Sequence, residues 1–111
     1  MQVTFEPRVA FGLRSPIGVT APGTVAVHWS LLSPCQPYDA TARAMLTAGT
    51  ITVTVTGKAT GPCPMDIVSG LPYRAEVRGI PAGRYTIRVV HRYADVAWPE
   101  EIALEAEVDV P

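Results

Sequence analysis

The sequence contains few charged residues, no asparagine and no long apolar run. Charged residues make up 17% of the 111 positions, below the usual quarter. Nine basic and ten acidic residues leave a formal net charge of −1, so the charge balance indicates neither a nucleic-acid partner nor an anionic membrane surface. No apolar run approaches the roughly 20 residues that a membrane helix needs. We therefore expect no nucleic-acid partner and no membrane span.

Helix signals are also scarce, whereas turn-forming residues are abundant. Eleven prolines and nine glycines divide the chain into short segments. A chain of this length corresponds to one domain, residues 1–111. The composition favours an all-β fold, an antiparallel two-layer β-sandwich of six to seven strands.

Alternating apolar and polar residues locate the strands of this sandwich. Residues 40–48 fit a short helical turn or a strand about equally well, and a short strand is possible at 66–69. The alternation predicts that Trp29 lies in the core and that Ile102 points inward. It also places Thr50, Thr52, Thr54 and Thr56 on an outer face. The expected strands are residues 2–11, 24–32, 50–57, 73–78, 84–93 and 101–110.

The segment 79–93, GIPAGRYTIRVVHRY, carries the strongest local pattern. Pro81 and Gly83 suit a short hairpin loop, which pairs residues 73–78 with 84–93. In that register Glu76 faces Arg88 and Val77 faces Ile87, so that opposite charges meet and apolar residues meet. We therefore predict an antiparallel hairpin here.

This segment resembles the closing hairpin of transthyretin-like or carboxypeptidase-regulatory-like sandwich domains. It is also similar to segments of bacterial immunoglobulin-like and fibronectin-like modules. Proteins of these families are mainly accessory or interaction domains without enzymatic activity. The resemblance therefore implies a non-enzymatic module.

Cys35 and Cys63 fall in proline-rich loops that the expected topology places at one end of the sandwich. A disulfide between them would stabilise a small domain by about 3–4 kcal/mol in the chain-entropy model. The alternative is two unpaired thiols. A disulfide would indicate an oxidising compartment, and therefore an extracytoplasmic or secreted protein.

Residues able to support catalysis or bind a metal are few. The only histidines are His28, on an outward position, and His91, on the inward face opposite Tyr73. Cys63, Met65 and His91 are an alternative copper or zinc set, although the short Cys-to-His-to-Met segment of blue-copper proteins is missing. No GxSxG nucleophile motif is present. We predict no catalytic residues and no cofactor, with a metal-binding sandwich protein or small enzyme as the alternative.

Four aromatic residues are candidates for a binding surface at the loop end: Tyr38, Tyr73, Tyr93 and Trp98. Exposed rings in such positions are typical anchors for a protein or glycan partner, although the same rings could simply cap the core. We therefore expect a binding module that engages a protein or a glycan through its loops. A peptidase inhibitor, presenting the loop 61–66 braced by the disulfide, is a further alternative.

Overall fold

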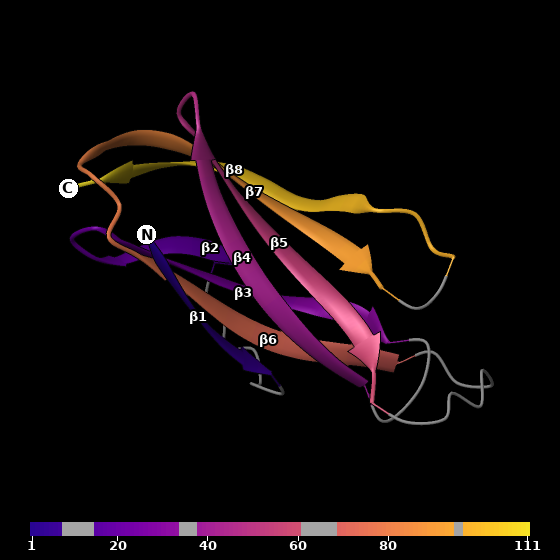
Figure 1. Cartoon of the computed structure of the whole chain (residues 1–111). Coiled ribbons are helices and arrows are strands. Elements are labelled where there is room, and N and C mark those ends of the chain that lie inside the picture. The colour runs from indigo at the N-terminus through magenta and orange to yellow at the C-terminus, as the bar shows by residue number, and fades with distance from the viewer. Residues whose placement is uncertain (8–14, 34–37, 61–68, 95–96) are drawn as a thin grey trace.

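The computed structural model describes residues 1–7, 15–33, 38–60, 69–94 and 97–111. These residues form strands and their connections and contain no helix (Figure 1). The strands are β1 (Gln2–Pro7), β2 (Ile17–Ala21), β3 (Thr24–Ser33), β4 (Tyr38–Thr47), β5 (Thr50–Ala59), β6 (Ser69–Arg78), β7 (Gly83–Tyr93) and β8 (Glu101–Val110).

The strands form two four-stranded sheets, which confirms the all-β, two-layer prediction. The first sheet has the order β1-β6-β3-β2, and the second has the order β4-β5-β7-β8. One core cluster joins residues from both sheets. Its fully buried aliphatic side chains come from alternate positions of the strands, because successive residues of a strand point to opposite faces. They are Val25, Val27, Leu31, Ile51, Val53, Val55, Ala75, Ile87 and Val89.

The predicted hairpin between residues 73–78 and 84–93 is wrong, although both segments are strands. β6 pairs with β1 and β3, whereas β7 pairs with β5 and β8. Val77 therefore faces Val25 and not Ile87. The pairing was misassigned because an alternating apolar strand matches any other alternating strand equally well.

The connection between β6 and β7 crosses from one sheet to the other. Ile80 lies in this connection with only 4% of its surface exposed, and its main-chain N–H donates to the Gly23 carbonyl at 3.1 Å. The Tyr85 hydroxyl donates to the Pro81 carbonyl at 2.7 Å. A residue buried between the layers draws the chain inward, so the turn residues Pro81 and Gly83 do not close a hairpin.

This crossing makes the pairing between β5 and β7 parallel, so the antiparallel prediction needs a correction. Ile51 faces Ile87 and Val53 faces Val89 along the parallel pair. Parallel neighbours need a crossover connection, and here β6, in the opposite sheet, serves as that crossover. The other strand pairs are antiparallel.

Two side chains predicted to be inward are more exposed than expected. Trp29 is 36% exposed, although it alternates in step with the buried residues Val25, Val27 and Leu31 of β3. Ile102 is 60% exposed, because a register shift inserts Ala103 between the partners of Val89 and Val90. A β-bulge of this kind reverses the face on which the following side chains lie.

Several boundaries also differ from the sequence prediction. β2 lies between the predicted strands 2–11 and 24–32, where no strand is predicted, so the described strands outnumber the six or seven predicted. The ambiguous residues 40–48 are part of the strand β4, and β6 begins earlier than expected. β1 is an edge strand that ends at Pro7, as proline in a strand indicates. Most of the possible strand at 66–69 lies outside the described residues.

Candidate functional site

A hydrogen bond between Tyr73 and His91 joins the two sheets inside the sandwich. Tyr73 on β6 is fully buried and His91 on β7 is 2% exposed. The Tyr73 hydroxyl lies 2.7 Å from His91 Nε2, and the two rings meet edge to face at a centroid distance of 5.7 Å. Phe5 stacks on the Tyr73 ring from β1. The sequence analysis placed His91 opposite Tyr73 as neighbours in one hairpin, whereas the structure brings the two side chains together across the layers.

Burial keeps both groups neutral. It lowers the pKa of His91 to about 4. It also raises the pKa of Tyr73, to which repulsion from Tyr93 adds. The Glu101 Oε1 lies 3.9 Å from His91 Nδ1, so we assign the imidazole proton to Nδ1, facing this carboxylate. Nε2 then accepts from the Tyr73 hydroxyl. Each of these two buried polar groups therefore has a hydrogen-bond partner.

The histidines do not form a shared site. His28 lies on β3, half-buried, beside a hollow of about 170 Å³ on the outer face of the first sheet, whereas His91 lies between the sheets. Over the ranges that the structure covers, no group of three or more His, Cys, Asp and Glu residues is arranged to hold a metal ion. Cys63 and Met65 of the alternative metal set lie outside these ranges.

The structure separates the four aromatic candidates. Tyr73 is a core residue and offers no surface to a partner. Tyr93 and Trp98 pack edge to face at 5.0 Å, both half-buried. Tyr38 begins β4, and its side chain is outside the described part. The cysteines Cys35 and Cys63, and the loop 61–66, also lie outside it, so the disulfide and the inhibitor loop stay predictions.

The Tyr93 hydroxyl is buried and has no hydrogen-bond partner among the described groups. Burial raises the pKa of Tyr93, Glu101 raises it further, and the Leu32 main chain acts in the opposite direction. The Leu32 main chain is therefore near the hydroxyl but does not meet hydrogen-bond geometry. A polar atom without a partner is unusual in a buried position.

A shallow groove, lined largely by threonine, alanine and charged side chains, crosses the outer face of the second sheet. Its main part has a volume of about 610 Å³. A second hollow of about 200 Å³ adjoins it, because Thr41 and Thr56 line both. The main part is lined by Thr41, Arg43, Ala44, Met45, Thr52, Thr54, Thr56 and Arg92. The second hollow is lined by Asp39, Ala40, Thr41, Thr56, Lys58, Thr60 and Ala94.

The groove follows from the strand pattern of β4 and β5. Thr52, Thr54 and Thr56 alternate with buried valines and isoleucine on β5, so that their side chains share the outer face. Lys58 and Ala94 place the second hollow toward the ends of β5 and β7, where the chain enters the loops. The groove therefore runs from the middle of the sheet to the loop end.

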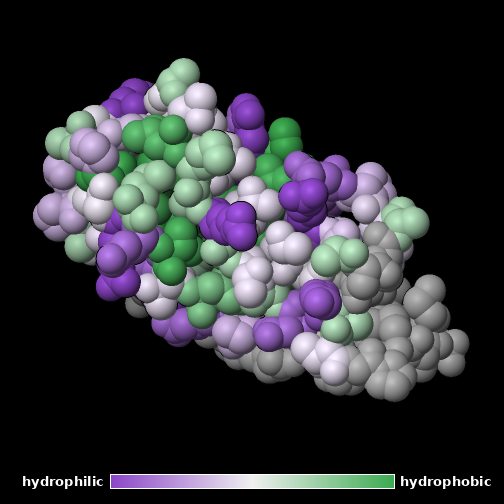
Figure 2. Space-filling view, in the orientation of Figure 1, coloured by the Kyte–Doolittle hydropathy of each residue, from purple (hydrophilic) through white to green (hydrophobic). Residues whose placement is uncertain are grey.

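Figure 2 shows the molecule from the side on which β4 passes in front of β3 and β6. Hydrophobic side chains gather toward the end farthest from the grey residues, whereas pale and hydrophilic side chains are more frequent near them. Met45, 68% exposed, is the large apolar side chain of the groove lining. The lining contains no aromatic ring among its described residues.

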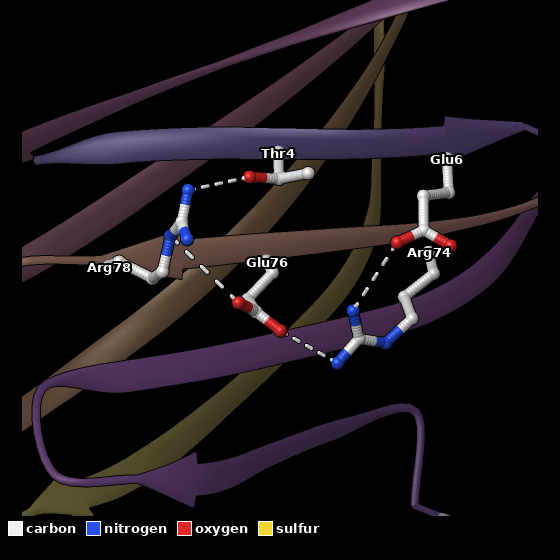
Figure 3. Close-up of polar contacts among 5 residues, drawn as sticks. All are labelled: Thr4, Glu6, Arg74, Glu76 and Arg78. Carbon is white, nitrogen blue, oxygen red and sulfur yellow. Dashed lines mark hydrogen bonds and ion pairs between the residues drawn. The ribbon is translucent and has the colours of Figure 1, made fainter.

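Charged side chains outside this groove largely neutralise one another. On the outer face of the first sheet, Glu76 bonds Arg74 at 2.7 Å and lies 3.8 Å from Arg78, while Arg74 reaches Glu6 and Arg78 donates to Thr4 (Figure 3). On the second sheet, β7 and β8 are joined by Arg84–Glu107 and Arg88–Glu105, both at 2.7 Å. These surfaces present paired charges to solvent.

Asp39 and Arg43 on β4 are not neutralised in this way. Every other described arginine has a carboxylate partner, and every other described carboxylate lies within 3.9 Å of a basic side chain. Among the described residues, Asp39 accepts only from the neighbouring Ala40 N–H, at 2.9 Å. Within the described ranges, Arg43 has no ion pair. Free charge on this sheet face therefore concentrates at the groove.

No family model, no curated protein and no solved structure matches this chain. Among the residues described, no helix has the length and apolar character needed to cross a membrane.

Sequence reasoning found the row of threonines on β5 but not the groove. The missing information was the neighbour of each strand, because Arg43 and Arg92 reach the same groove from β4 and β7, on either side of β5. The signal that could have indicated a site is the regular alternation of threonine with β-branched apolar residues in TITVTVTG.

Proposed function

We propose that this protein is a non-enzymatic binding module that engages a glycan through the groove on the outer face of β4, β5 and β7 and through the adjoining loop end. The observation that carries the proposal is the continuity of the two hollows, which share Thr41 and Thr56. Two adjoining hollows suit an elongated ligand better than a compact one. The site is extracytoplasmic in this proposal, as the predicted disulfide Cys35–Cys63 implies.

The residues that line the groove favour a sugar chain over a protein surface as the ligand. Protein interfaces depend on buried aromatic and apolar anchors, and the described lining offers only Met45 as a large apolar side chain. Hydroxyl groups of Thr52, Thr54 and Thr56 both donate and accept hydrogen bonds, which matches the hydroxyls of a sugar chain. Lys58 adds a positive charge that has no ion-pair partner among the described residues, which favours sugars that carry carboxylates.

A protein partner is the second candidate, and a different observation favours it. Tyr93 and Trp98 form an aromatic pair near the loop end, and both rings retain some exposure. Rings of this kind are typical anchors of protein partners. The second proposed occupant therefore contacts the loop end and leaves the groove open.

The fold type belongs to the same proposal. Two facing four-stranded sheets support an immunoglobulin-like or transthyretin-like module, a class that the segment 79–93 resembles. The parallel pair β5–β7 departs from the antiparallel pattern of immunoglobulin sandwiches. In this proposal the module is a variant of that architecture.

The test is calorimetric titration of the purified protein with neutral and uronic-acid oligosaccharides. Thr54→Val removes a hydroxyl from the groove without changing side-chain shape, and Thr86→Val does the same on β7 outside the groove. We expect Thr54→Val to weaken binding on the order of tenfold, the effect of one lost hydrogen bond, and Thr86→Val to leave it unchanged. Equal effects, or binding to no sugar in the panel, would contradict the glycan proposal.

A further inference from the structure

The free edge of β4 lacks the features that protect the other three edges among the described strands, although β1 of the first sheet lies close beside it. β1 is short and ends at Pro7, and β2 is short with a register shift. β8 is interrupted by a bulge at Ala103 and carries Glu101, Glu105, Glu107 and Asp109. β4 has ten residues, no proline and an unbroken register. Prolines, bulges and rows of like charge are the features that keep sheet edges from pairing with other chains.

Asp39 and Arg43 supply opposite charges on this same edge strand. They are separated by an even number of positions, so both side chains lie on the outer face. Both are exposed, and neither has an ion-pair partner in the described part of the chain. Lys58 lies opposite Asp39 on β5, but these two described side chains form no ion pair. The two charges are thus available to a strand that adds to the edge.

We propose that β4 pairs antiparallel with β4 of a second copy, about a two-fold axis at Thr41. In this register Asp39 of each copy faces Arg43 of the other, because antiparallel pairing about Thr41 exchanges positions equally distant from it. Ala40 of each copy faces Ala42 of the other on the inner face. The small alanines meet without a clash, and two charge pairs form.

A second copy fits this edge because the charge pattern is complementary to itself. A two-fold interface brings the same surface of both copies together. If a residue of one copy contacts a second residue of the other copy, the same contact with the two copies exchanged must therefore also form. Asp39 and Arg43 meet this condition, and a net charge of −1 opposes association only weakly. The second sheets of both copies then form one continuous sheet.

This pairing also has a consequence for the groove. Thr41 lines both hollows, so the grooves of the two copies meet at the two-fold axis. A ligand chain can then extend from one copy to the other. The self-pairing itself does not depend on what the groove binds.

The test is sedimentation equilibrium of the full chain at low ionic strength, with circular dichroism to verify folding. We expect a reversible dimer. Asp39→Arg and Arg43→Asp each replace two attractions by two repulsions, and each should weaken the dimer on the order of tenfold or more. The double variant D39R/R43D restores complementarity and should restore the dimer.

Asp109→Arg is the matched control, because it makes the same charge change on β8, the opposite edge of the same sheet. It should leave the dimer unchanged. If a reversal variant fails to fold, Asp39→Asn and Arg43→Gln replace it and should each weaken the dimer. A protein that stays monomeric at its highest soluble concentration overturns the proposal. A dimer that tolerates both single reversals, or that D39R/R43D does not restore, also overturns it.

Discussion

The Tyr73 hydroxyl and His91 Nε2 meet at 2.7 Å between the two sheets, where neither residue is accessible to solvent. β6 supplies the tyrosine from the first sheet and β7 supplies the histidine from the second. A hydrogen bond of this kind fixes the position of one layer relative to the other, which non-directional apolar contacts do less specifically.

The stability of the protein should fall as the pH drops through the range set by His91. Its pKa is about 4 in the folded protein, because burial disfavours the charged imidazole, against about 6.5 in the unfolded chain. Between these values the unfolded chain binds more protons, so stability is complete above pH 6.5 and declines toward pH 4. The loss due to His91 should be on the order of 3 kcal/mol, measured by urea unfolding at a series of pH values.

Carboxylates also titrate in the lower part of this range, so the contribution of His91 needs a control. The variant Tyr73→Phe/His91→Leu removes the imidazole together with the hydroxyl that it would leave unpaired. This variant should show a distinctly smaller decline between pH 6.5 and pH 4. A decline equal to that of the wild-type protein would show that His91 is not the titrating group.

Two tyrosine hydroxyls should differ in their effect on stability. Tyr73→Phe leaves His91 without its buried partner, and the free energy of unfolding should fall by about 1–2 kcal/mol. Tyr93→Phe removes a buried hydroxyl that has no partner among the described groups, and should be neutral or slightly stabilising. Chemical denaturation of both variants makes the comparison. Equal losses would show that the Tyr93 hydroxyl is hydrogen-bonded, with the nearby Leu32 main-chain N–H the first donor to consider.

The crossing between the sheets should depend on Gly23. Gly23 has a φ of +73°, and a Cβ at this position would lie 3.2 Å from the Ile80 carbonyl oxygen. Gly49 has a similar φ of +79° but open space around it. Both substitutions by alanine carry the left-handed backbone cost of about 1 kcal/mol. Gly23→Ala should lower the thermal midpoint further than Gly49→Ala, because it also crowds the main chain of the crossing.

The Gly49→Ala variant serves as the control for backbone conformation alone. A second variant, Ile80→Ala, removes the side chain buried at the crossing and should cost about 2–4 kcal/mol. Equal thermal midpoints for Gly23→Ala and Gly49→Ala would contradict the close approach of Gly23 to Ile80.

The sequence predicted which residues form strands far better than which strands are neighbours. The alternation in 50–57 and 84–93 identifies β5 and β7 because burial of one face requires a period of two. Pairing partners are not encoded in this way, since Val77 can face Ile87, Val25 or Val3 with similar packing. Ile80 is buried where the chain crosses between the sheets. In the sequence, a single apolar residue beside a turn does not predict such a crossing.

The difference between predicting strands and predicting their neighbours also explains how much of the candidate site the sequence revealed. The outward threonines of β5 follow from local alternation, and the sequence predicted them correctly. The sequence analysis predicts Tyr73 on a binding surface at the loop end, but β6 begins at Ser69 and carries the ring into the core. The groove combines residues of three strands, so it could be found only when the strand order was known.

The most direct test of the proposed binding face is an amide chemical-shift titration of isotope-labelled protein with the oligosaccharide that binds most tightly. The account predicts shifts at Thr52, Thr54 and Thr56 and at Thr41 across the groove, with the amides of β1 and β6 unchanged. Shifts confined to the first sheet, or to Trp98 and the loop end with the β5 threonines unmoved, would contradict it.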